Sequence, residues 1–90
     1  MGVTEDLADD LARDVIEAEK TLGLEDGALT NEIATVLGAS SSTTQEAFLT
    51  AMRVRRSEQR ARKYLEAKLA GSEDIPKLPS TGDLIETNDH

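Results

Sequence analysis

The sequence contains no cysteine, one histidine and only two aromatic residues. Without cysteine the chain cannot form a disulfide, and it has no thiolate for metal binding or nucleophilic catalysis. Because Phe48 and Tyr64 are the only aromatic residues, a core has to be built mainly from Leu, Ile, Val and Ala. Such a core favours helices packed on helices over a sandwich of strands. The sequence therefore predicts an all-α fold.

Motifs for catalysis are missing as well. The one histidine, His90, is the last residue, where a side chain is too poorly held to serve a nucleophile or a metal. No glycine-rich phosphate loop and no zinc-ligand spacing occurs. The acids at 9, 10, 14 and 17 have the spacing of an exposed helix face rather than of a metal site. We expect no enzyme activity, no metal and no cofactor.

No stretch is long and apolar enough to span a membrane, and the first thirty residues lack the segments of a signal peptide. Together with the absence of cysteine, this predicts a soluble, cytoplasmic protein that does not contact membranes. Ninety residues leave room for one small domain with a modest core.

Helical periodicity marks a first helix that begins after Thr4, its expected N-cap, and ends at Gly23. Its expected apolar stripe recurs at helical spacing at Leu7, Leu11, Val15, Ala18 and Leu22. A second helix begins at 27 or 31 and ends near Leu37, where Gly38 is expected to supply a left-handed residue.

A third helix is expected from about residue 43, capped by Ser42 with Gln45 or by Thr43 with Glu46. No Gly or Pro interrupts the pattern from 44 to 70, which favours one long helix. Alternatively, Ser57 starts a separate helix over 58–70. Residues 1–70 are thus predicted to form a small bundle of three or four helices.

Residues 71–90 contain both prolines, two glycines and scattered acids. This composition predicts a flexible acidic tail. The alternative is a short linear motif that docks on a partner or on the domain through Ile75, Leu78, Leu84 and Ile85.

The stretch 29–43, LTNEIATVLGASSST, joins a short amphipathic run to a Ser/Thr cluster. Ala34 stands where the first helix of a helix-turn-helix has a small residue, Gly38 follows at the turn, and Leu37 and Ala39 flank it. Residues 29–53 resemble the DNA-binding domains of quorum regulators, because they share the sequence pattern T-N…E-I-A…L-G…S…T. This resemblance implies a helix-turn-helix whose second helix reads DNA. The sequence departs from the pattern at Thr44, where the family has a branched apolar residue, and at Glu46, an acid on the expected DNA-facing helix.

Charge is distributed unevenly, although the net value is −8. Residues 1–50 carry a net −9, residues 51–70 a net +5 and residues 71–90 a net −4. A basic run of this kind suits phosphate, for which arginine offers a planar fork. The candidate DNA-binding residues lie within 41–63, with Ser41, Ser42, Thr43, Gln45 and Thr50 at base edges and Arg53, Arg55, Arg56, Arg60, Arg62 and Lys63 at phosphates.

A different hypothesis gives these cations an internal role. Arg53, Arg56, Arg60 and Lys63 share one helical face, and the first helix offers Asp6, Asp10, Asp14 and Glu17 at matching spacing. If the two faces pair, the chain is better described as a non-catalytic helical interaction module, an adaptor or inhibitor with an acidic face and a linear-motif tail. The first hypothesis predicts a small DNA-binding regulatory protein, with a homodimer as its expected state; the second predicts a protein partner.

Overall fold

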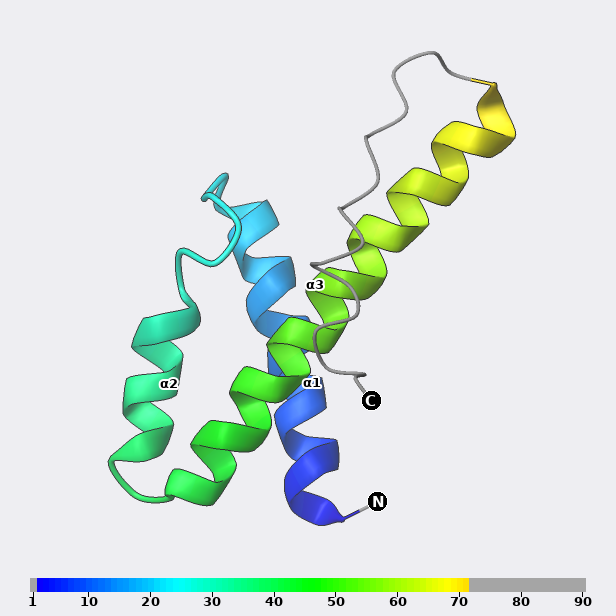
Figure 1. The fold of residues 1–90 in the computed structure, drawn as a ribbon. Helices are drawn as coiled ribbons and strands as arrows, with labels where there is room; N and C mark the ends of the chain where they lie inside the picture. The colour runs from blue at the N-terminus through cyan, green and yellow to red at the C-terminus, as the bar shows by residue number, and fades with distance from the viewer. Residues whose placement is uncertain (1, 72–90) are drawn as a thin grey trace, which may run out of the picture. The chain divides into compact units, whose positions relative to one another are not determined.

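The computed structural model describes residues 2–71, which form three α-helices joined by two short connections (Figure 1). Helix α1 spans Val3–Thr21, α2 spans Thr30–Gly38 and α3 spans Ser42–Ala70. No strand occurs in this part of the chain, so the all-α prediction is confirmed. The predicted tail lies, apart from its first residue, outside the described residues.

The chain divides into two units. The first contains α1, α2 and α3 as far as Gln59, and the second begins at Arg60 and includes the rest of α3. Helix α3 itself is unbroken, so Ser57 does not start a separate fourth helix. Its strong helix formers and the absence of Gly and Pro account for this length.

Helix α1 begins one residue before the predicted cap, Thr4. Its N-cap is Gly2, which has an extended backbone and makes no side-chain capping bond. Glu5 in the first turn favours the helix through its interaction with the helix dipole. The C-terminal end is as predicted, because Gly23 has φ +70° and the Leu24 amide donates to the Glu19 carbonyl at 2.8 Å, the pattern of a Schellman motif.

Helix α2 ends at Gly38, but not through a left-handed residue. The described glycines with positive φ are Gly23, Gly27 and Gly71. Gly38 belongs to the helix, and the chain leaves it through Ala39, which keeps right-handed backbone angles of φ −63° and ψ −26°. The prediction of a left-handed Gly38 is therefore wrong: a turn that stays right-handed here does not require glycine.

Helix α3 is capped one residue earlier than predicted. The Ser41 hydroxyl accepts a hydrogen bond from the Thr44 backbone amide at 3.1 Å and donates to the Thr44 hydroxyl at 2.9 Å. Neither Ser42 nor Thr43 is the cap. Thr44, which departs from the family pattern, thus places its polar group in the cap rather than an apolar group in the core.

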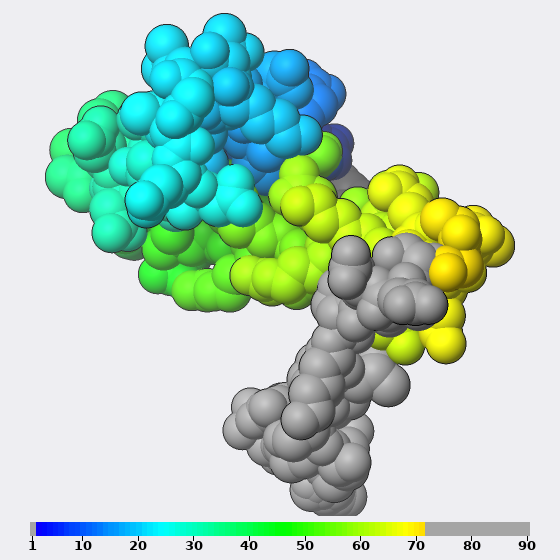
Figure 2. Space-filling view, turned by 90° about the horizontal axis from the view of Figure 1, so that it is seen from above, coloured from blue at the N-terminus to red at the C-terminus, as the bar shows by residue number. Residues whose placement is uncertain are grey.

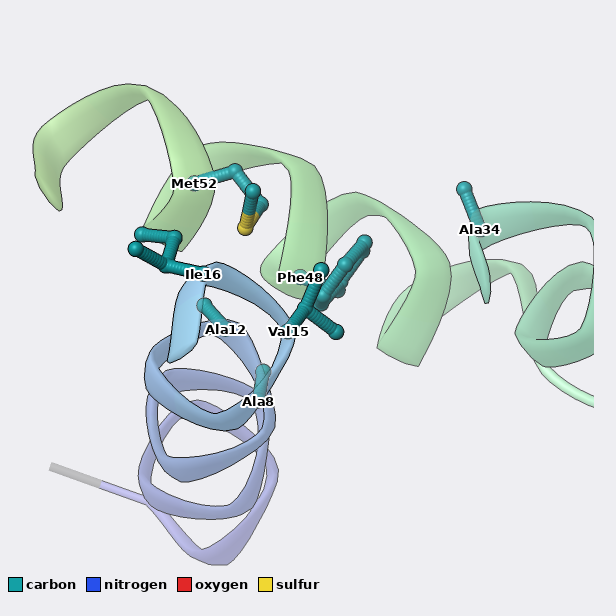
Figure 3. Close-up of a cluster of buried hydrophobic side chains, with 7 residues drawn as sticks. All are labelled: Ala8, Ala12, Val15, Ile16, Ala34, Phe48 and Met52. Carbon is teal, nitrogen blue, oxygen red and sulfur yellow. The ribbon is translucent and has the colours of Figure 1, made fainter. Parts of the chain in front are cut away.

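The core lies where α1 and α3 cross, with α2 beside them (Figure 3). Phe48 and Met52 of α3 face α1, and Phe48 is fully buried. Burying such a side chain contributes about 1.5–3 kcal/mol. The buried apolar residues of this cluster are Ala8, Ala12, Val15, Ile16, Ala34, Phe48 and Met52.

The buried face of α1 is rotated by about one position from the predicted stripe. Val15 is buried as predicted, but Leu7 and Leu22 are 62% and 66% exposed, and Ala8 and Ala12 lie inside instead. Small residues at a helix crossing allow close packing of the two helices, which accounts for alanines rather than leucines at these buried positions. Exposed leucines are common on protein surfaces.

Candidate nucleic-acid interface

Arg56, one of the predicted phosphate contacts, is held inside the three-helix unit. Its Nη2 lies 2.6 Å from Oε1 of Glu19 on α1, and its Nη1 lies 3.6 Å from Oδ1 of Asp26 in the loop between α1 and α2. The Arg56 side chain is 15% exposed and that of Glu19 only 2%. Arg56 therefore stabilises the fold, and removal of Glu19 would leave this largely buried guanidinium with only the more distant, exposed Asp26 as a charged partner.

Glu19 also fixes the loop between α1 and α2. Its two carboxylate oxygens accept hydrogen bonds from the Gly27 amide at 3.1 Å and the Leu29 amide at 2.9 Å. Burial raises the pKa of Glu19, but the bonds from Leu29, Gly27 and Arg56 outweigh it, so the pKa lies below its ordinary value. Figure 2 shows this loop in cyan at the surface. The Glu19 carboxylate thus connects α1, the loop and α3.

Arg55 is paired with α1 as well. Its Nε and Nη2 lie 2.7 and 2.9 Å from the two carboxylate oxygens of Asp9, a two-pronged contact near the surface. The hydrogen bond from Arg55 holds the pKa of Asp9 below its ordinary value, because it stabilises the charged carboxylate. Arg55 and Arg56 thus both contact acids of α1.

The sequence predicted pairing between α1 and α3, but through other residues. Asp9 and Glu19 are the acids that meet α3, whereas Asp10 and Asp14 lie 3.4 Å from Arg13 on α1 itself. The rotation of α1 explains the difference, since Glu19 lies on the buried face with Val15 and Ile16. An acid at a core position of a helical stripe is a sequence signal that could have indicated a buried ion pair.

Two of the predicted base contacts are used by the turn between α2 and α3. Ser41 caps α3, and the Gln45 side-chain amide donates to the Ala34 carbonyl of α2 at 2.9 Å. Ala34 is buried and Leu37 packs against the core, so the end of α2 and the start of α3 are both fixed at this turn. These contacts fix how α3 leaves α2, and they occupy Ser41 and Gln45.

A polar face of α3 remains turned away from the core. Its residues recur at helical spacing, are all exposed and share about one quadrant of the helix surface. Within residues 2–71, none of these five side chains takes part in a hydrogen bond or ion pair. We call this set the outer face of α3; it consists of Ser42, Thr43, Glu46, Thr50 and Arg53.

The other predicted cations belong to the second unit. Arg60, Arg62 and Lys63 are exposed on the C-terminal part of α3. All three residues belong to the part of α3 that begins at Arg60. Side chains of this kind can contact phosphate without taking part in base recognition.

Within the described part of the chain, no cluster of acids and histidine has the arrangement of a metal site. None of the three helices is long and apolar enough to cross a membrane.

No protein-family model, curated protein or solved structure matches this chain. The resemblance of residues 29–53 to the quorum-regulator domains therefore stays a prediction. What the structure adds is geometry: a nine-residue helix, a three-residue turn at 39–41 and a long helix with an exposed polar face.

Proposed function

We propose that this chain is a small DNA-binding protein that places the outer face of α3 in the major groove. The supporting observation is that this face combines exposure, hydroxyl groups and a guanidinium, while the contacts of Ser41, Gln45 and Arg56 hold the helix from behind. From Ser42 to Arg53 the helix rises about 16 Å. The major groove is about 12 Å wide and admits one α-helix.

The arrangement of α2 and α3 supports the same proposal. Two helices joined by a turn of three or four residues form the helix-turn-helix, in which the second helix lies in the groove. Here α1 packs behind α3 through Phe48 and Met52, so the opposite side of α3 is left to contact DNA.

Electrostatics sets the conditions for binding. The net charge of −8 opposes encounter with DNA, so attraction has to come from local cations. Arg53 lies on the outer face, and Arg60 and Lys63 lie further along α3. Arg55 and Arg56 contribute less, because each contacts an acid of the chain. We expect measurable binding mainly at low ionic strength.

A salt titration with short duplex DNA tests the proposal. Each neutralised phosphate contributes about −0.9 to the slope of log affinity against log salt, so Arg53→Ala should make the slope shallower by roughly one unit. The matched control is Arg55→Ala, which removes a guanidinium already paired with Asp9 and should leave the slope nearly unchanged. Absence of binding by the unmodified protein at low salt would refute the proposal.

A second candidate function is supported by apolar side chains in the second unit. Leu65 and Leu69, one turn apart on α3, are 53% and 79% exposed. Adjacent exposed leucines are typical of a surface that contacts another helix, which suits an interaction module or a homodimer. Sedimentation equilibrium should then show self-association that Leu65→Ser weakens. A monomer that binds duplex DNA would count against this candidate.

A further inference from the structure

Glu46 lies in the middle of the outer face of α3. It is exposed, it falls one turn after Ser42 and one turn before Thr50, and none of the described ion pairs includes it. No basic residue stands within one turn of it on α3, since Arg53 is two turns away. The fold therefore makes no use of this carboxylate, although it lies on the surface that we propose contacts DNA.

A carboxylate in the major groove discriminates strongly among bases. It repels phosphates and the acceptor atoms of guanine and thymine, and it accepts a hydrogen bond from the N4 amino group of cytosine. Adenine also has an amino group there, but its N7 acceptor lies beside it and opposes a negative charge. Cytosine is thus the base edge whose hydrogen-bonding pattern best suits Glu46.

We infer that Glu46 is a specificity-determining residue that selects a cytosine in the DNA contacted by the outer face. This inference rests on the proposed DNA-binding function and goes further, because it names the base. Arg53 lies seven residues along the helix, about 10 Å, which is the rise of about three base pairs. Arginine pairs with guanine through O6 and N7, so the preferred site contains a cytosine and a guanine about three base pairs apart.

A carboxylate on the DNA-facing helix is unfavourable for affinity, because its negative charge weakens binding to every DNA sequence. Such a residue is useful on this face only if it discriminates among bases. Removing the charge should therefore increase non-specific affinity while it reduces discrimination. If Glu46 served only solubility, its substitution would leave the preferred base unchanged at every position of the DNA site.

The experiment selects duplexes from a library with randomised base pairs, at low salt, using the full chain and two variants. Glu46→Gln removes the charge and introduces an amide, which pairs with adenine through N6 and N7. Glu17→Gln makes the same change at an exposed acid of α1 and serves as the control. The unmodified protein and the control should enrich cytosine about five-fold or more at one position, and Glu46→Gln should shift that position toward adenine.

The possible results separate the two proposals. If all three proteins bind DNA and enrich the same base, the role of Glu46 is refuted while DNA binding stands. If Glu46→Gln binds every duplex more tightly with unchanged preference, the carboxylate acts only through charge, and the inference is equally refuted. If no protein binds any duplex at low salt, both the proposed function and this inference fail.

Discussion

Between Ser42 and Gln59, α3 has an inner face and an outer face whose polar groups are used in different ways. On the inner face, Arg56 contacts a buried carboxylate and Gln45 contacts a backbone carbonyl of α2. On the outer face, Arg53 and Glu46 take no part in the internal contacts of the described residues. Arg53 and Arg56 are only three residues apart and chemically identical. Their position around the helix relative to α1 gives them separate roles.

This difference shows why a run of basic residues is an ambiguous signal. The charge pattern alone predicts one continuous phosphate-binding surface. Once α1 packs on α3, Arg55 and Arg56 pair with acids of α1, whereas Arg53 on the outer face makes no such pair within the described residues. The charge that a partner can meet is thus smaller than the sequence count, which gives Arg53 more weight in the proposed DNA binding.

The largest expected effect comes from the apolar centre of the inner face. Phe48→Ala removes a fully buried ring from the hydrophobic core cluster and should lower the free energy of unfolding by about 3–5 kcal/mol. Urea denaturation followed by circular dichroism measures the loss. Thr50→Ala on the outer face, the control, should stay within about 0.5 kcal/mol.

A small domain has only about 5–15 kcal/mol of stability, so Phe48→Ala can prevent folding altogether. The milder Phe48→Leu keeps the measurement possible and should cost less than the alanine variant. Equal stability of the Phe48 and Thr50 variants would show that the two faces of α3 are wrongly assigned.

The next effect concerns the buried ion pair. Glu19→Gln removes the nearer charged partner of Arg56, leaves only Asp26 at 3.6 Å, and weakens the bonds to Gly27 and Leu29. We expect a loss of about 2–3 kcal/mol in the free energy of unfolding at neutral pH. Glu17→Gln, an exposed acid on the same helix, should change stability little. A Glu19 variant as stable as this control would contradict the assigned network.

The same pair makes stability depend on pH with a defined sign. The pKa of Glu19 in the folded protein lies below its ordinary value of 4.5, so folding favours the charged carboxylate. Its stabilisation is present above pH 4.5 and is lost as the pH falls through the lower pKa of the folded state. Urea midpoints measured at successive pH values should fall in this acidic range for the unmodified protein. The decrease should be smaller for Glu19→Gln.

Much of the fold followed from sequence because the helices depend on local signals. The absence of Gly and Pro between Thr44 and Ala70 predicted one long helix, and Gly23 marked the end of α1. Exact caps were less predictable: Ser41, Ser42 and Thr43 all have suitable hydroxyls, and the choice among them depends on how α2 meets α3. The left-handed geometry expected of Gly38 was wrong because its backbone remains helical.

The candidate site was less accessible to sequence reasoning, because it depends on how α1 is rotated. A stripe chosen by residue size places Leu7 and Leu22 inside, whereas close packing places Ala8, Ala12 and Glu19 there. Because of this rotation, the acids that pair with α3 are Asp9 and Glu19 rather than the predicted ones. Arg53 is exposed as predicted, whereas Arg55 and Arg56 pair with these acids and contribute less to a DNA-binding surface.

The smallest expected effect provides the sharpest comparison, because it concerns two arginines that are only two residues apart. Arg55 contacts Asp9 near the surface, where ion pairs are weak and screened by salt. Arg55→Ala should therefore lower the melting temperature slightly at low salt and by less at high salt. Arg53→Ala removes no internal contact of the described residues and should leave the melting temperature unchanged at both salt concentrations. The DNA titration should rank the variants in the opposite order, with the shallower slope for Arg53→Ala. If both variants change stability and salt slope to the same extent, the division of α3 into an inner and an outer face has no functional meaning.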